Sequence, residues 1–378
     1  MRITSLELLH VRPRWLFLIV HTDEGIDGYG EPIVEGRART LAEAVRELEP
    51  LLIGEDPTRI EHLWQKMYRG AFYRGGPVLC SAISGVDTAL WDITGKALGV
   101  PVHRLLGGPV RDRVRMYPHV GGSSPAEIAE AAKKRVSDGF TCMKMSVTPP
   151  LRHVEPPEVV EREVERFAAV RAAVGNGIDI AIDFHGRVSY PLALRLTRAL
   201  EPYNPMFIEE PVLPDDPESM ALIARSTVTP IATGERLFTR WGFSPIFEKR
   251  AASIVQPDLA HCGGISEGRR IAAAAETVSA GIAPHNPLGP INLAASLQLA
   301  LATPNFIIQE FSGSAERREL GVGLITEPFE VKAGYIERRE APGLGIELEY
   351  DSIVADEFDG TWTTPTLTHT DDGSVAEW

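Results

Sequence analysis

The chain has 378 residues, of which 44% are hydrophobic, and this is enough to bury one large core and a smaller second one. Its formal net charge of −14 argues against nucleic acid or an anionic membrane as a partner, because phosphate groups would be repelled. Cys80, Cys142 and Cys262 are far apart in the sequence, so neither a disulfide framework nor a zinc site is indicated. We therefore expect a cytoplasmic protein of two domains, without a signal peptide or membrane helix.

Residues 1–113 mix short strands with helices. Alternating residue patterns predict the strands and helical periodicity predicts the helices, with strands at 3–11, 15–21 and 28–31 and helices at 40–52, 60–68 and 78–98. The first of these helices should begin at Thr40, where Thr40-Leu41-Ala42-Glu43 matches a capping box. The mixture predicts an N-terminal α+β capping domain.

From Val114 the pattern repeats as strand, turn and helix. Eight strands are predicted, at 114–120, 141–147, 178–183, 205–209, 230–233, 252–256, 281–284 and 306–309. Ser124 and Asp216, each followed by proline, are clear helix N-terminal signatures. The repeats predict an α/β fold with a (β/α)8 TIM-type barrel over 114–318. Residues 319–378 are expected to return to the first domain, so that the barrel is inserted in the cap.

Three of the predicted strands lead into an acid, and Asp183, Glu209 and Glu235 are spaced 26 positions apart. Parallel strands of a barrel bring their carboxyl ends to one face, so the three side chains should converge there. Each pair of carboxylates at about 4 Å would repel by roughly 4 kcal/mol at an effective dielectric constant near 20. A divalent cation would relieve this repulsion, and oxygen ligands favour Mg²⁺, with Mn²⁺ as a substitute. The alternative is that each acid pairs separately with a basic residue at the barrel rim.

Two histidines are candidates for acid–base chemistry. Asp258 and His285 lie one βα unit apart, so the carboxylate can fix the tautomer of the ring and make His285 a general base. His285 could instead be structural. His185 leaves its strand on the same side as Asp183 and could act as a general acid, or could merely support the metal carboxylates.

Further polar residues are expected around the substrate. Glu310, in a buried and acidic setting, should be protonated and could donate a hydrogen bond to a developing negative charge, unless it forms a rim salt bridge. Lys144 could neutralise a substrate carboxylate or merely offset the acids. Arg14, Trp15 and Tyr73 of the cap are expected to close over the barrel mouth and contact the substrate.

Several long motifs resemble those of the enolase superfamily, in particular of its mandelate racemase-like branch. Within that branch the motifs are most similar to those of the galactonate dehydratases. These motifs are Thr22-Asp23-Glu24-Gly25, residues 35–40, residues 72–77, residues 183–189, residues 207–212, Gln256-Pro257-Asp258-Leu259, Ala283-Pro284-His285 and Ser374-Val375-Ala376-Glu377-Trp378. The resemblance covers essentially the whole chain and implies the capped barrel. It also implies Asp183, Glu209 and Glu235 as magnesium ligands, His285 with Asp258 as base, His185 as acid, Glu310 as stabiliser of the intermediate, and a symmetric homo-oligomer.

The implied activity is magnesium-dependent dehydration of a sugar acid, galactonate or a close aldonate, to a 2-keto-3-deoxy acid. The reaction removes the C2 proton and then the 3-hydroxyl. A racemase or epimerase of an α-substituted carboxylate, with His185 as its second base, is the alternative, and a non-catalytic sugar-acid binding protein is a third reading. Ser146 and the segments 148–157 and 311–315 depart from the family pattern near the expected substrate.

Overall fold

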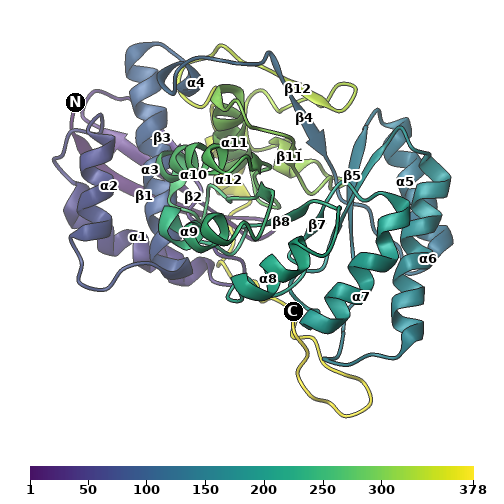
Figure 1. Cartoon of the computed structure of the whole chain (residues 1–378). Coiled ribbons are helices and arrows are strands. Elements are labelled where there is room, and N and C mark those ends of the chain that lie inside the picture. The colour runs from purple at the N-terminus through teal and green to yellow at the C-terminus, as the bar shows by residue number, and fades with distance from the viewer.

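A three-stranded antiparallel sheet and the helices packed on it form the N-terminal part of the chain (Figure 1). The computed structural model describes residues 1–378. The strands are β1 (Ile3–Val11), β2 (Trp15–Thr22) and β3 (Gly28–Gly30), and the helices are α1 (Ala38–Leu52), α2 (Ile60–Arg69), α3 (Gly76–Leu98) and the short α4 (Val102–Leu105). The predicted elements of the cap are therefore all present.

Strand β2 shows how the cap is joined to the rest of the molecule. Leu16, Leu18 and Val20 pack with the cap helices, whereas Trp15 and the alternate residues after it belong to the larger core that includes the barrel. Because side chains alternate between the faces of a strand, β2 contributes to two hydrophobic cores at once. The cap is thereby packed firmly against the barrel.

The capping box predicted at Thr40 is wrong. Helix α1 begins at Ala38, and its N-cap residue Arg37 makes no side-chain capping bond. Ala38 and Leu41 are buried in the cap core, whereas Thr40 is exposed. Apolar packing therefore decides where this helix begins.

Eight parallel strands form the barrel. They are β4 (Arg113–Tyr117), β5 (Cys142–Ser146), β6 (Asp179–Asp183), β7 (Ile208–Glu209), β8 (Ile231–Thr233), β9 (Ile254–Val255), β10 (Gly281–Ile282) and β11 (Gln309–Glu310). Strands β5 to β10 pair in sequence order, and β11 pairs with β4. Parallel bridges between His119 and Lys144 and between Ile282 and Phe306 join these two sheets into one ring.

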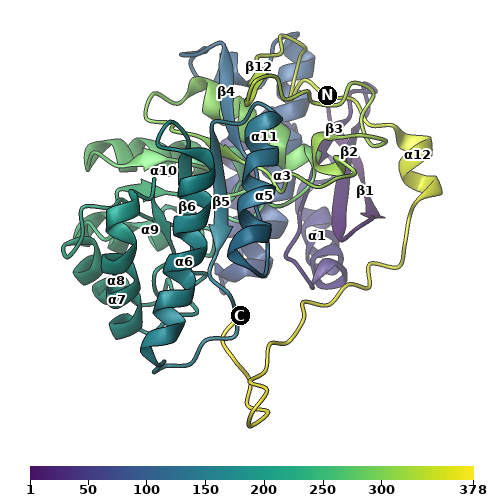
Figure 2. The same cartoon turned by 90° about the vertical axis from the view of Figure 1, so that its right-hand side faces the viewer.

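The helices that follow the strands cover the outside of the barrel (Figures 1 and 2). They are α5 (Pro125–Ser137), α6 (Pro157–Val174), α7 (Tyr190–Leu200) with the 3-10 turn η1 (Glu201–Tyr203), α8 (Pro217–Ala224), α9 (Thr239–Lys249), α10 (Gly264–Thr277) and α11 (Pro290–Ala302). The predicted caps of Ser124 and Asp216 are confirmed, since each side chain accepts a hydrogen bond from the backbone of its helix. The eighth strand differs from the predicted repeat because the 3-10 turn η2 (Arg318–Leu320), and not an α-helix, comes directly after β11.

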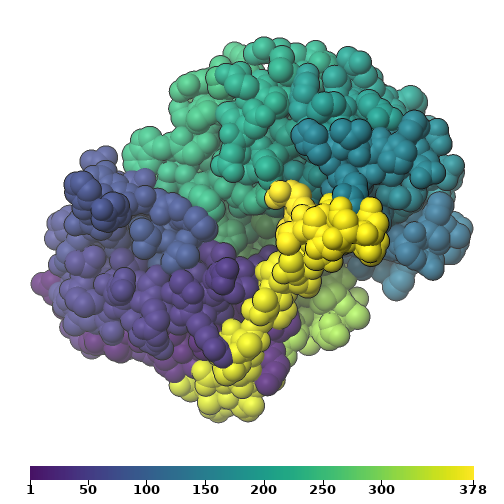
Figure 3. Space-filling model, turned by 90° about the horizontal axis from the view of Figure 1, so that it is seen from below, coloured from purple at the N-terminus to yellow at the C-terminus, as the bar shows by residue number.

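The C-terminal residues contact both parts of the molecule. Strand β12 (Tyr335–Glu337) pairs antiparallel with β4, and α12 (Tyr350–Ala355) lies beside β1. The final residues then run without helix or strand from the cap side back to the barrel (Figures 2 and 3). No helix of the chain combines the length and apolar character that a membrane-spanning segment needs.

Candidate active site

Three carboxylates meet at the C-terminal ends of neighbouring barrel strands. Asp183 is the last residue of β6 and pairs in register with Glu209, the last residue of β7. Glu235 follows the end of β8 by two residues. One oxygen atom from each carboxylate lies within 4.8 Å of the others. The structure thus brings together the three acids that the strand spacing predicted to converge.

The surroundings of these acids fit a divalent cation. Burial, together with the charge of nearby acids, raises the pKa of Glu209 to about 8 and the pKa of Glu235 to about 7. The Oδ2 atom of Asp183 is buried and accepts no well-aligned hydrogen bond, although Lys144 and His185 lie 3.4 and 3.1 Å from it. A cluster of oxygen ligands with mutual repulsion and an unsatisfied acceptor is the donor set that hard cations such as Mg²⁺ prefer.

The ammonium group of Lys144 lies among the same acids and is buried. Its Nζ atom lies 2.9 Å from Oε2 of Glu209, 3.4 Å from Oδ2 of Asp183 and 2.6 Å from Oε1 of Glu310. Burial disfavours the ammonium charge, but Glu209 and Glu310 hold the pKa of Lys144 well above its usual value. Lys144 therefore offsets part of the negative charge, which is one of its two predicted roles.

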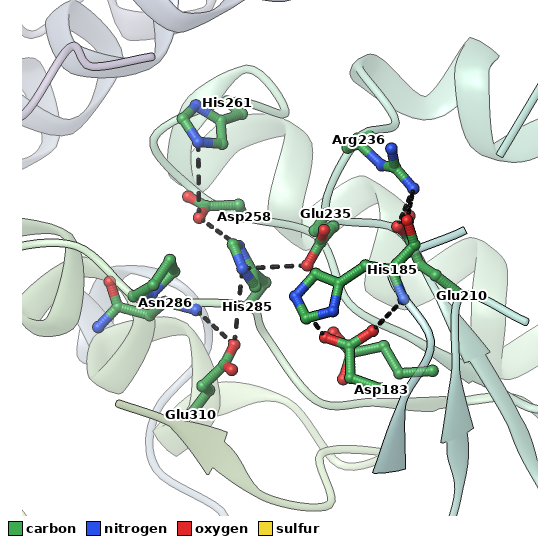
Figure 4. A network of polar contacts seen from close by, with 12 residues as sticks. Asp183, His185, Glu210, Glu235, Arg236, Asp258, His261, His285, Asn286 and Glu310 are labelled. Atoms are coloured by element: carbon green, nitrogen blue, oxygen red, sulfur yellow. Dashed lines mark hydrogen bonds and ion pairs between the residues drawn. The ribbon is translucent and has the colours of Figure 1, made fainter. Parts of the chain in front are cut away.

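His285 is oriented by Asp258, as expected for residues on neighbouring strands. Nδ1 of the ring lies 2.8 Å from Oδ2 of Asp258, and Nε2 lies 3.1 Å from Oε2 of Glu235 (Figure 4). Burial opposes a charge on the ring, yet Glu235, Glu310 and Asp258 hold the pKa of His285 well above its usual value. In the metal-free chain the ring is therefore protonated on both nitrogens, with Nδ1 paired to Asp258 and Nε2 paired to Glu235.

Asp258 is itself held by helix α11 and, through that helix, by the cap. Its Oδ1 atom accepts hydrogen bonds from the backbone of Ala260 at 2.8 Å and from Nδ2 of Asn292 at 3.0 Å. The buried carboxylate of Glu31, just after β3, accepts hydrogen bonds from the backbone N–H groups of Gly289 and Asn292 at 2.7 and 2.9 Å. Glu31 thus caps the N-terminal end of α11 and fixes the position of Asn292. Sequence reasoning missed this residue.

His185 pairs with Asp183, a different acid of the cluster from the one that His285 contacts (Figure 4). Its Nε2 atom lies 3.1 Å from Oδ2 of Asp183, and its backbone N–H donates to Oδ1 of the same carboxylate at 2.7 Å. The residue has a φ of 52°, a left-handed conformation that turns the chain as it leaves β6. Burial lowers the pKa of His185 to about 4, so the ring is neutral near neutral pH in the free chain.

Comparisons with known proteins agree with this geometry along the whole chain. The model of the mandelate racemase/muconate lactonizing enzyme N-terminal domain matches residues 10–107, and that of the enolase C-terminal domain-like family matches residues 127–352. The chain belongs to the enolase superfamily. A D-galactonate dehydratase from Ralstonia nicotianae is 47% identical over 384 residues, and one from Variovorax paradoxus is 46% identical over 385 residues, each covering 100% of both chains.

Solved structures show the same capped barrel. A mandelate racemase/muconate lactonizing enzyme from Jannaschia sp. superposes with a TM-score of 0.90 and 32% identity, covering 97% of this chain and 99% of that one. An enolase-superfamily member from Salmonella Typhimurium superposes with a TM-score of 0.88 and 32% identity, covering 93% and 97% of the respective chains. The predicted family and fold are confirmed.

In this enolase-superfamily member the predicted protonation of Glu310 is wrong. Its Oε1 atom lies 2.6 Å from Nζ of Lys144 and 2.5 Å from Nε2 of His119, and its Oε2 atom accepts from the backbone of Asn286 at 3.0 Å. Burial raises the pKa of Glu310, but Lys144, His285 and His119 outweigh it and hold that pKa well below its ordinary value. Glu310 is therefore an anion, because cations rather than acids surround it.

A pocket of about 460 Å³ opens beside Glu235, one of the three acids, and reaches the cap. Glu235 and His285 line its inner end, and residues of the cap and of the C-terminal tail line the outer end. Arg14 lies at its edge, where it forms an ion pair at 2.5 Å with the pocket residue Glu35.

The structure places the two other predicted cap contacts away from this pocket. Trp15 is only 3% exposed and stacks on Phe17 in the core at a centroid distance of 6.3 Å. Tyr73 is 81% exposed and lies over α1 and α2 on the outside of the cap. The strand pattern gave no information about the direction in which a loop or a buried aromatic ring would project.

Proposed function

We propose that this chain is a magnesium-dependent hydro-lyase that removes water from D-galactonate or a close aldonate and yields a 2-keto-3-deoxy acid. The observation that carries the proposal is that two histidines pair with two different acids of the cluster, His185 with Asp183 and His285 with Glu235 (Figure 4). The full-length identity of 47% to a D-galactonate dehydratase supports the choice of substrate.

Asp183, Glu209 and Glu235 would hold the metal ion. Mg²⁺ suits their oxygen ligands, and Mn²⁺ can replace it. When bound, the ion draws electron density from the substrate carboxylate and makes the adjacent C–H group more acidic. The chain's own residues carry out the proton transfers that follow.

His285 is the base that removes the proton from C2. A metal ion held by Glu235 would neutralise the carboxylate that most raises the pKa of the ring, so that Nε2 could release the proton that it carries in the metal-free chain. Its Nδ1 atom is bonded to Asp258 at 2.8 Å, so the nitrogen that faces the pocket is Nε2. Asp258 stabilises the imidazolium that forms when Nε2 takes the proton. Asp258 is held in position by Asn292, and Asn292 is held in position by Glu31.

His185 is the acid that protonates the departing hydroxyl at C3. Since burial lowers the pKa of its ring to about 4, the free chain carries it in the neutral form. A bound sugar acid brings a negative charge that favours the imidazolium, so substrate binding prepares the acid. After the hydroxyl leaves as water, the enol product becomes the 2-keto-3-deoxy acid.

Lys144 and Glu310 hold the charge balance around the reacting carbons. Glu310, as an anion, keeps Lys144 and His119 in place. Lys144 can then balance the negative charge that develops when C2 loses its proton.

The direct test is turnover of a panel of aldonic and aldaric acids with Mg²⁺, followed by NMR detection of 2-keto-3-deoxy products. We expect D-galactonate or a close aldonate to give the product with the wild-type chain and not with His285→Asn. Appearance of a C2 epimer without loss of water would establish an epimerase instead. No reaction with any acid, and no exchange of the C2 proton, would leave a binding protein and contradict the proposal.

A further inference from the structure

The last residues of the chain form a strap that joins the cap to the barrel. On the cap side, Arg39 pairs with Asp359 at 2.7 Å and the guanidinium of Arg14 lies 4.9 Å from the ring centroid of Trp362. On the barrel side, Arg152 pairs with Asp371 and with Asp372. Figure 3 shows this strap, in yellow, crossing between the cap and the barrel. We define the strap as residues 359–378.

The strap reaches the outer end of the active-site pocket, where Trp378 remains 43% exposed. Trp378, the last residue, lines the same pocket as Glu235 and His285. Its ring meets the ring of His185 edge to face, with centroids 5.9 Å apart and an interplanar angle of 89°. Ala376, two residues earlier, is 8% exposed, so the end of the chain is anchored against the barrel.

Arg187 also contacts the ring of Trp378. Its guanidinium carbon lies 5.2 Å from the centroid of the indole ring. The residue is 9% exposed, and its Nε atom is buried without a hydrogen-bond partner. A buried cation with an unsatisfied donor needs compensation, and the face of an indole ring provides it through a cation–π contact.

From this arrangement we propose that Trp378 is a specificity-determining residue that forms the outer wall of the substrate pocket, with Arg187 as its positioning residue. The inference rests on the proposed function and deepens it. The carboxylate end of a sugar acid lies at the three acids and C3 lies by His185, so the carbons beyond C3 extend toward Trp378. An indole ring packs against the C–H groups of those carbons, and its N–H group can donate to a hydroxyl.

The first test compares acids of different length. We expect Trp378→Ala to lower kcat/KM for six-carbon D-galactonate about tenfold, mainly through KM, and Trp378→Phe to retain more activity because a ring remains. A four-carbon aldonate ends before the wall, so its kcat/KM should change by less than about twofold. Val375→Ala is the matched control, since that side chain belongs to the strap and is 73% exposed. An equal loss for both acids, or no loss for D-galactonate, would overturn the proposal.

Arg187 is tested through Trp378. Arg187→Met should raise KM for D-galactonate. Arg187→Lys should raise KM less, because the cation over the ring is kept. If the lysine variant behaves like the methionine variant, the positioning role is refuted.

A second test separates this proposal from the proposed function. If Trp378 covers His185, then Trp378→Ala should increase the rate at which diethyl pyrocarbonate modifies His185, measured by mass spectrometry relative to His285, and Val375→Ala should not. An unchanged rate would refute the wall whatever the substrate is. Faster modification of His185 in Trp378→Ala, together with a wild-type chain that turns over no aldonate, would retain the wall and refute the dehydratase function alone.

Discussion

The Nδ1 atom of His285 lies 2.8 Å from Oδ2 of Asp258, while Oδ1 of the same carboxylate is bound by the backbone of Ala260 and by Asn292. Both oxygens of Asp258 are thus engaged, and the carboxylate cannot rotate away from the histidine. This fixed pair distinguishes His285 from a histidine that is merely buried.

Asp258→Asn should therefore impair the base without unfolding the chain. The amide can present its N–H group to Nδ1, which would favour the wrong tautomer of His285 and lower the rate of C2 proton removal by about 10²–10⁴-fold. Exchange of the C2 proton of D-galactonate in deuterated water, followed by NMR, measures this step. Asp138→Asn, at an exposed helix end, is the control. Wild-type exchange in the Asp258 variant would refute the assignment of the base.

His185→Asn should separate the two halves of the reaction. Dehydration should fall by about 10²–10⁴-fold, because the leaving hydroxyl loses its proton donor, while C2 exchange by His285 continues. The same NMR experiment records both signals. Normal dehydration by this variant would show that another group is the acid. Loss of C2 exchange in this variant, when the wild-type chain itself releases no water, would favour a two-base epimerase.

Removal of the metal should abolish turnover. Chelation with EDTA followed by dialysis should stop the reaction, and Mg²⁺ should restore it, with partial recovery by Mn²⁺. Asp183→Asn removes one charge from the cluster, so it should weaken Mg²⁺ binding at least about tenfold in calorimetric titration. Exposed Asp138→Asn should bind Mg²⁺ as the wild type does. Full activity of the metal-free chain would contradict the proposed metal chemistry.

The parts of the site that could be predicted from sequence are those that the barrel repeat positions. Strand pattern and βα spacing place Asp183, Glu209 and Glu235 at one face, and they place Asp258 beside His285. These predictions depend only on which end of a strand a residue occupies. Backbone periodicity is sufficient for them.

The parts that could not be predicted depend on contacts between distant segments. The ionisation of Glu310 depends on Lys144 and His119, which approach it from other strands. Trp378 reaches His185 only because the strap crosses the molecule, and Glu31 reaches α11 from the cap. No local pattern records such contacts, although the acid just after β3 and the aromatic residue at the chain end could have marked these positions for inspection.

The burial of Glu31 predicts a pH dependence of stability. Burial raises the pKa of this carboxyl group to about 8 from its ordinary value of 4.5, against the hydrogen bonds from Asn292 and Gly289, which lower it. Between those two pH values the folded chain binds a proton that the unfolded chain has released. Glu31 therefore makes the free energy of unfolding fall as the pH rises through this window, by at most about 1.4 kcal/mol per pH unit.

Glu31→Gln should remove this contribution. Its curve of unfolding free energy against pH, from urea denaturation of the metal-free chain between pH 5 and 8, should be flatter than that of the wild type. At pH 5 the variant should be less stable than the wild type. The two oxygens of Glu31 accept hydrogen bonds from the backbone N–H groups of Gly289 and Asn292, whereas an amide has one oxygen and would point its NH₂ group at the second N–H group. Glu158→Gln, at an exposed position of α6, should keep the wild-type slope. If the two curves of unfolding free energy against pH are parallel, Glu31 is ionised throughout this range. The N-terminal end of α11 would then stabilise the buried carboxylate charge fully.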